Sequence, residues 1–257
     1  MSEGLMIVYA SLIGLALGSF LNVCIVRLPA GRSILRPRSS CPACGHQLAW
    51  FENIPVLSYI ALGGRCRSCK VHIPLRYPAV EMAAALIWVG SYLYFDSIWR
   101  ALTGALFGTI LLGIAVTDAR DYIIPDELSL GGLVIGLGLS FLPGGTEPLW
   151  SLVGAVAAFA VMYGVAVGGE WVFKKPALGG GDIKMMAMVG AFLGPGYAML
   201  AIFVGSVVGA VIFGPIGLKT GKLVPFGLFL AVGAAVVFIW GDAMVSWYMT
   251  TVLDLYA

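Results

Sequence analysis

Long apolar runs separated by short polar stretches dominate this chain. A helix that crosses a membrane needs about 20 mostly apolar residues, and eight segments approach that length. They lie at about residues 5–26, 79–95, 98–117, 127–142, 149–173, 183–194, 197–217 and 223–248. The one long polar stretch, 27–78, falls between the first two. The pattern predicts an all-α polytopic membrane protein with about eight transmembrane helices, in three parts: a first helix at 1–26, an extramembrane domain at 27–78 and a membrane domain at 79–257.

The sixth predicted helix is short. About a dozen residues separate Asp182 from Gly194, and at about 1.5 Å each they span roughly 18 Å. The hydrocarbon layer is about 30 Å thick, so one end of this segment lies below the membrane surface. Either the glycine run 179–181 or the turn 194–196 is submerged. If it is the glycine run, Asp182 lies in a water-filled recess, because irregular backbone at that depth needs protein or water around it.

Composition supports a membrane protein and charge orients it. The chain is 60% hydrophobic and 11% charged, against about 25% charged in soluble domains. Eight of its fifteen Lys and Arg residues lie between Arg27 and Arg76, opposed there only by Glu52. The positive-inside rule explains this basic stretch better than nucleic-acid binding does. We therefore expect 27–78 on the cytoplasmic side, both termini outside, and Asp118, Asp126 and Asp182 on the cytoplasmic side.

Four cysteines in the basic stretch have the spacing of a metal site. Cys41 and Cys44 form one Cys-x-x-Cys pair, and Cys66 and Cys69 form a second. Two such pairs at this separation indicate tetrahedral zinc held by four thiolates in a small zinc-ribbon-like domain. A disulfide or redox role is the weaker interpretation in a reducing compartment. Because four cysteines suffice, His46 and His72 are not expected to be ligands.

Four aspartates of the membrane domain also have a purely structural interpretation. Asp126 and Asp182 each precede an apolar run and suit helix N-caps, and Asp121 suits a solvated loop. Asp118 lies at the C-terminal end of a predicted helix, where the dipole disfavours negative charge. A structural Asp118 would need a partner such as Arg120 or Lys184. Two carboxylates held together could instead activate a water molecule and protonate a leaving amine.

Several motifs together resemble the prepilin peptidases, or type IV leader peptidases, which are membrane aspartyl proteases of the Gly-x-Gly-Asp type. The matching stretches are Gly18–Arg27 with Pro29, Asn53–Pro55, Ser58-Tyr59, the two cysteine pairs, Arg76–Pro78 with Glu81, Asp118 with Ile124-Pro125-Asp126, and Gly179–Lys184. In many zinc knuckles glycine stands where this chain has Lys70.

The resemblance implies an enzyme of the bacterial inner membrane that cleaves the basic leader of prepilins or pseudopilins at the cytoplasmic face. Asp118 and Asp182 would be catalytic, supported by Gly179, Gly181, Lys184, Pro125 and Asp126. Many members also methylate the new N-terminus with S-adenosylmethionine, for which we consider Glu81, Asn22, Asn53 and Arg76. The alternatives are a transporter or channel with a regulatory zinc module, and a non-catalytic assembly factor for a pilus or secretion apparatus.

Overall fold

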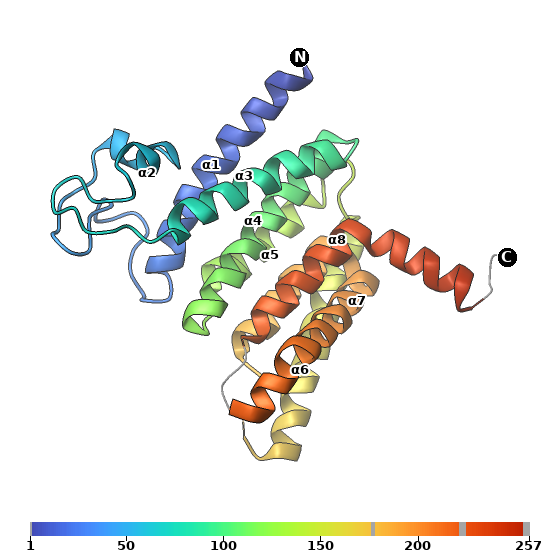
Figure 1. The fold of residues 1–257 in the computed structure, drawn as a ribbon. Helices are drawn as coiled ribbons and strands as arrows, with labels where there is room; N and C mark the ends of the chain where they lie inside the picture. The colour runs from blue at the N-terminus through green and yellow to red at the C-terminus, as the bar shows by residue number, and fades with distance from the viewer. Residues whose placement is uncertain (1, 176–177, 221–224, 254–257) are drawn as a thin grey trace. The chain divides into compact units, whose positions relative to one another are not determined.

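The computed structural model describes residues 2–175, 178–220 and 225–253, and this part of the chain is helical with no β-strand (Figure 1). The helices are α1 (Glu3–Arg27), η1 (Trp50–Asn53), α2 (Leu57–Ala61), α3 (Arg76–Tyr94), α4 (Ile98–Asp121), α5 (Asp126–Leu139), α6 (Pro148–Phe173), α7 (Gly180–Thr220) and α8 (Phe226–Thr251).

Each of the eight predicted segments coincides largely with a helix; residues 223 and 224 of the last segment lie outside the described residues. The sixth and seventh form a single helix, α7, which breaks at Gly194 with φ 75° and ψ 174°. Glycine is suited to this backbone conformation because it lacks a Cβ, and Pro195 follows it. The break therefore lies where the short segment was expected to end, and the helix before it starts at Gly180 rather than at residue 183.

Five helices of the described residues are long and apolar enough to cross a membrane: α1, α4, α6, α8 and residues 180–213 of α7. Helix α5 has only 14 residues, and α3 carries Arg76 and Glu81 within its 19. The chain is thus an all-α polytopic membrane protein.

The chain divides into two compact units, Met1–Gly113 and Ile114–Ala257. In the N-terminal unit α1 and α3 pack antiparallel. A Cβ on Gly14 would lie 2.6 Å from the Ala85 Cα atom, and a Cβ on Gly18 would lie 2.7 Å from the Glu81 Cα atom. Small residues permit this close approach between membrane helices.

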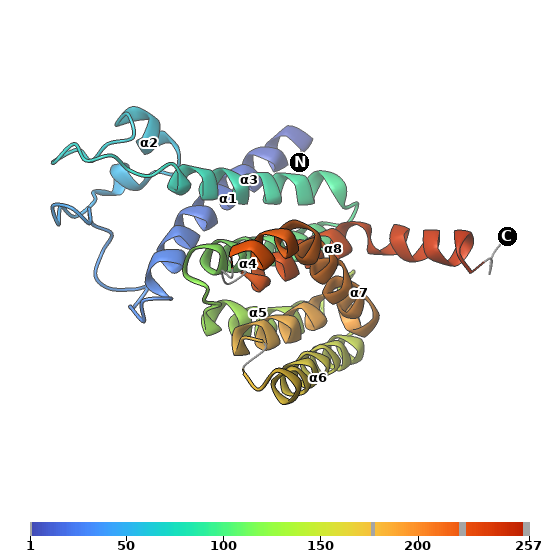
Figure 2. The ribbon, with the colours of Figure 1, turned by 60° about the horizontal axis from the view of Figure 1, so that its bottom comes forward.

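In the C-terminal unit the first half of α7 forms the core. From Asp182 to Phe192 every residue except Lys184 is buried, and a helix that is apolar all round is expected to be enclosed. Helix α7 as a whole packs against α5, α6 and α8. Its first half approaches α5 at Phe192 and α6 at Gly190, and Figure 2 shows this half between α5 and α6. The enclosed helix starts with the predicted Gly-Gly-Gly-Asp sequence.

Candidate functional site

Asp118 lies near the end of α4 and is 6% exposed. Its Oδ2 atom accepts a 2.8 Å hydrogen bond from the backbone N–H of Leu228, and its carboxylate also bonds to the backbone of Gly227. These residues are in the first turn of α8, whose N-cap, Pro225, provides no side-chain cap. The N-terminus of α8 therefore stabilises the negative charge of Asp118.

This pairing differs from the cationic partner considered for Asp118. Arg120 instead bonds to Asp121 at 3.0 Å, and Lys184 bonds to Asp126 at 2.8 Å. The amide groups at the start of α8 take the place of a cation because they are donors that helix geometry leaves without an intrahelical acceptor.

Asp182 lies in the first turn of α7 and is 8% exposed. Because the helix begins at Gly180, Asp182 is inside it and is not the N-cap residue. Its carboxylate bonds to the backbone of Gly179, and a Cβ on Gly179 would lie 3.0 Å from its Oδ2 atom. The absence of a side chain at Gly179 thus leaves room for the carboxylate.

Ile124 lies against the glycines beside both aspartates, Gly181 next to Asp182 and Gly227 next to the Asp118 carboxylate. A Cβ on Gly181 would lie 2.9 Å from the Ile124 Cβ atom. A Cβ on Gly227 would lie 2.6 Å from the Ile124 Cδ1 atom and 3.0 Å from the Asp118 Oδ2 atom. The Asp118 charge also acts electrostatically on Asp182. The fold therefore brings together two acids that are 64 residues apart in the sequence.

Asp126 has a different role from the N-cap that was expected. The N-cap of α5 is Pro125, and Asp126 is the first residue of the helix. Both of its carboxylate oxygens accept from the Lys184 Nζ atom at 2.8 Å. This exposed ion pair ties the start of α5 to the start of α7, and such pairs contribute about 0–1 kcal/mol.

Gly227 and Ile124 are site residues that the sequence reasoning missed. Gly227 follows Pro225 at the start of an apolar run, and a helix N-terminus of this kind commonly binds an anion. The sequence therefore contained a sign that the start of this helix could bind an anion. The connection of Gly227 with Asp118, 109 residues earlier, could not be predicted, because only the tertiary fold brings the two together.

The four cysteines between α1 and α3 form one cluster. Their Sγ atoms all lie within 4.8 Å of one another, with 3.8 Å between Cys41 and Cys69 and 4.0 Å between Cys44 and Cys66. Sulfur atoms at about 2.3 Å from a tetrahedral zinc ion are about 3.8 Å apart. The cluster therefore has the dimensions to hold a metal ion.

The two cysteine knuckles have similar backbones. An antiparallel bridge closes each one, between Ser40 and Gln47 and between Arg65 and His72. Lys70 has a φ of 60°, close to the 72° of Gly45 at the matching position of the first knuckle. Lysine thus adopts the left-handed conformation there without displacing the sulfur atoms.

Backbone amide groups favour the thiolate form at Cys41 and Cys66. The backbone N–H of Cys44, with that of Ala43, lowers the pKa of the Cys41 thiol to about 7. The backbone N–H of Cys69 similarly lowers the pKa of Cys66. At Cys44 the backbone N–H of His46 has the same effect, but burial and the hydrogen bonds to the other three cysteines outweigh it and raise the pKa to about 11. Thiolate is the form that binds a metal.

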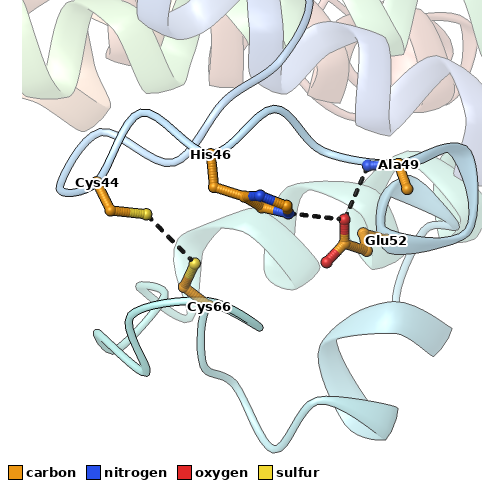
Figure 3. A network of polar contacts seen from close by, with 5 residues as sticks. All are labelled: Cys44, His46, Ala49, Glu52 and Cys66. Carbon is orange, nitrogen blue, oxygen red and sulfur yellow. Dashed lines mark hydrogen bonds and ion pairs between the residues drawn. The ribbon is translucent and has the colours of Figure 1, made fainter.

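His46 lies beside the cluster and bonds to a buried acid (Figure 3). Its Nε2 atom is 3.2 Å from the Glu52 Oε2 atom, which also accepts from the Ala49 backbone N–H at 2.8 Å. The Ala49 bond, followed by that of His46, lowers the pKa of Glu52. Glu52 is therefore an anion at neutral pH and holds His46 outside the four-sulfur cluster.

A second buried acid, Glu81, lies between α1 and α3. Its Oε2 atom accepts from the Val56 backbone N–H at 2.8 Å, and its carboxylate also bonds to the side chains of Ser19 and Asn22. Asn22 donates to the Tyr77 carbonyl at 2.9 Å. Of the four residues considered for a methyl donor, Glu81 and Asn22 meet in this buried network, whereas Asn53 and Arg76 are exposed.

Two family descriptions match the chain. Residues 12–95 match the Bacterial Peptidase A24 N-terminal domain, and residues 105–214 match the Type IV leader peptidase family.

Similar proteins cover most of the chain. A protein named prepilin leader peptidase/N-methyltransferase from Aeromonas salmonicida (strain A449) is 35% identical over 98% of both chains. One with the same name from Pseudomonas aeruginosa is 34% identical over 93% of this chain and 91% of its own. A third, from Myxococcus xanthus, is 38% identical over 85% of this chain, which spans 65% of that relative. No solved structure matches.

The fold and these matches define a class, the polytopic membrane proteases. Within that class, the chain belongs to the type IV leader peptidase family.

Proposed function

We propose that this protein is an aspartyl endopeptidase that removes the leader from prepilins or pseudopilins, with Asp118 and Asp182 as its catalytic residues. The observation that carries the proposal is the burial of two carboxylates around Ile124 in one unit, in a chain of the leader peptidase family. The family match and the named relatives favour this function over a transporter or a non-catalytic assembly factor.

The chemistry follows from the two carboxylates. One accepts a proton from a water molecule as the water oxygen bonds to the scissile carbonyl carbon. The other donates a proton to the leaving nitrogen as the C–N bond breaks. The amide groups of α8 orient Asp118 and Gly179 leaves space beside Asp182. The Lys184–Asp126 pair positions the helix that carries Asp182.

The charge distribution supports an inner-membrane orientation with the cysteine domain and the active site on the cytoplasmic side. Beyond the basic stretch 27–76, the residues assigned to that side include Arg120, Lys174, Lys175, Lys184, Lys219 and Lys222. The opposite side receives Glu3, Asp96, Glu147, Asp242 and Asp254, with Arg100 as its basic residue. Positive charge is retained on the cytoplasmic side of such proteins.

The metal of the cysteine cluster is proposed to be zinc with a structural role. Four thiolates complete a tetrahedral zinc site and leave no position for a reacting water molecule. The ion would link the two knuckles of a domain that is too small to form much of a core.

Methylation of the new N-terminus is proposed from the names of the relatives. The four residues considered for S-adenosylmethionine do not form one accessible binding site, because Glu81 and Asn22 are buried and hydrogen bonded within the chain. Asn53 and Arg76 are the two that a ligand can reach.

One reconstitution tests both activities. The full-length protein in liposomes is incubated with a prepilin, with and without S-adenosylmethionine, and the products are identified by mass spectrometry. We expect a cut at the leader in both conditions, and the added mass of one methyl group only with the donor. Asn53→Ala and Arg76→Ala should lose the methyl group and retain the cut. An uncut prepilin would refute the peptidase proposal, and ion flux without cleavage would favour a transporter.

A further inference from the structure

The extramembrane domain exposes large apolar side chains on the Trp50–Ile60 segment, which includes η1 and α2. Trp50 is 76% exposed, Leu57 66% and Ile60 69%. Leu75, at the start of α3, is 72% exposed. Soluble surfaces rarely gather apolar side chains of this size, and such a group marks a surface that something covers.

The depth of this segment is set by its attachment to a membrane helix. The Val56 N–H donates to Glu81, which is five residues into α3, or about 7 Å along its axis. The backbone of Glu81 also lies against Gly18 of α1, nine residues before that helix ends at Arg27. The segment therefore runs beside the last turns of α1, a helix long and apolar enough to cross a membrane, and the first turns of α3, rather than beyond them.

The conformation at this attachment is constrained. Val56 has a φ of 60° and a ψ of −47°, which is rare for a β-branched residue. Its N–H is held by a carboxylate that also bonds to Ser19 and Asn22. The orientation in which α2 presents Leu57 and Ile60 is thus fixed by contacts within the unit.

Exposed basic side chains accompany the apolar ones in this part of the chain. The Arg67 guanidinium lies 5.2 Å from the centre of the Phe51 ring, and Arg65, Lys70 and Arg76 are exposed nearby in the sequence. The one acid between Arg27 and Arg76, Glu52, is buried against Ala49 and His46. The domain therefore presents a basic surface, which disfavours a second copy of itself as the covering partner.

We propose that the Trp50–Ile60 segment is an interfacial anchor that docks the cysteine domain on the membrane. Trp50, Leu57 and Ile60 enter the lipid headgroup and upper acyl-chain region of the adjacent leaflet. The surrounding basic side chains bind the phosphates of anionic phospholipids. Tryptophan prefers this interface, and short apolar faces flanked by Lys and Arg bind it.

Photo-crosslinking tests the anchor directly. A benzophenone amino acid is placed at Leu57 or Ile60 of the full-length protein in nanodiscs of phosphatidylcholine and phosphatidylglycerol. The matched control is Val71, which is also apolar and exposed but lies on the second cysteine knuckle. Size-exclusion elution as for the wild type confirms that each variant is folded.

We expect lipid adducts at positions 57 and 60 in several-fold higher yield than at position 71. Equal yields at all three positions, or adducts to protein in place of lipid, would overturn the proposal. Protein adducts between copies would identify a self-interface, and adducts to an added prepilin would identify a substrate surface.

Tryptophan quenching provides a second measurement that needs no bulky substitution. Brominated acyl chains quench tryptophans within the bilayer, and Trp50→Phe removes one of seven tryptophans. The difference in fluorescence between the wild type and this variant reports Trp50. Brominated lipid should quench this difference, and aqueous acrylamide should leave it largely unchanged. If acrylamide quenches the Trp50 fluorescence and brominated lipid does not, Trp50 lies in water, which would contradict an interfacial anchor.

Discussion

At the scale of single residues, the candidate site depends on hydrogen bonds between two carboxylates and the backbone groups beside them. Asp118 lies in the last turn of α4, where the helix dipole disfavours a negative charge, and the start of α8 compensates through the amides of Gly227 and Leu228. Asp182 lies beside Gly179 in the first turn of α7. Both carboxylates thus bond to backbone groups that glycine makes accessible.

The three glycines before Asp182 differ in the space around them, so substitutions at Gly180 and Gly181 should differ in their effect on cleavage. In Gly181→Ala the new Cβ would lie 2.9 Å from the Ile124 Cβ atom, whereas at Gly180 nothing lies within 4 Å of a Cβ. Because a small displacement of a catalytic group is costly, Gly181→Ala should lower the cleavage rate by at least about 10-fold. Gly180→Ala should cleave like the wild type. Equal rates for the two variants would show that the Ile124 contact does not position Asp182.

The bond between Asp118 and α8 predicts a difference between two substitutions. Asparagine retains an oxygen that accepts from the Leu228 N–H, and alanine does not. Asp118→Ala should therefore be about 1 kcal/mol less stable than Asp118→Asn, the usual cost of a lost helix cap. Thermal unfolding in detergent measures the difference. Equal stabilities would mean that the bond contributes nothing to the fold.

At the scale of elements, the enclosed first half of α7 determines the architecture of the C-terminal unit. Its backbone approaches α6 so closely that a Cβ on Gly154 would lie 2.2 Å from the Gly190 carbonyl oxygen. Ser151 on α6 also donates to the Ala191 carbonyl at 2.6 Å. The two helices therefore cross backbone to backbone, which leaves no space for a side chain.

This crossing predicts that Gly154→Ala is strongly destabilising. Two backbones must separate to admit the methyl group, at a cost of about 3 kcal/mol. The control is Gly164→Ala on the same helix, where nothing lies within 4 Å of a Cβ, and its effect should be within about 0.5 kcal/mol. Thermal unfolding of the purified variants tests this, and a Gly154→Ala protein as stable as the wild type would exclude the close crossing.

The cysteine knuckles predict about one zinc ion per chain, because four thiolates complete one tetrahedral site. Cys41→Ser or Cys66→Ser should abolish stoichiometric zinc binding, measured by elemental analysis of the purified protein. Cys24→Ala, which replaces a cysteine buried in α1, should retain the metal. Zinc that persists in both serine variants would place the ion elsewhere.

At the scale of the whole molecule, the sequence predicted what local patterns encode. Apolar runs predicted the long helices, and Gly194-Pro195 marked the break in α7, whereas the short helices η1 and α2 were not predicted. The spacing of the cysteines predicted a cluster that the fold assembles. Each of these depends on residues near one another in the sequence.

The contacts that the sequence did not predict join distant residues. Asp118 bonds to Leu228 across 110 positions, and Lys184 bonds to Asp126 across 58. Charge alone suggested Lys184 or Arg120 as partners for Asp118, because the sequence does not show which helix N-terminus the fold brings to Asp118. The boundaries expected at residues 26 and 78 stay a prediction.

The central claim is that Asp118 and Asp182 together cleave the substrate. Its most direct test is the single-turnover cleavage rate of a prepilin by the reconstituted wild type, Asp118→Asn and Asp182→Asn, with Asp121→Asn as control. Asp121 ends the same helix as Asp118 and pairs with Arg120. We predict that each of the first two variants loses at least about a thousandfold in rate while remaining folded, and that the control cleaves like the wild type. Cleavage at the wild-type rate by either Asp118→Asn or Asp182→Asn would show that these two aspartates are not a catalytic pair.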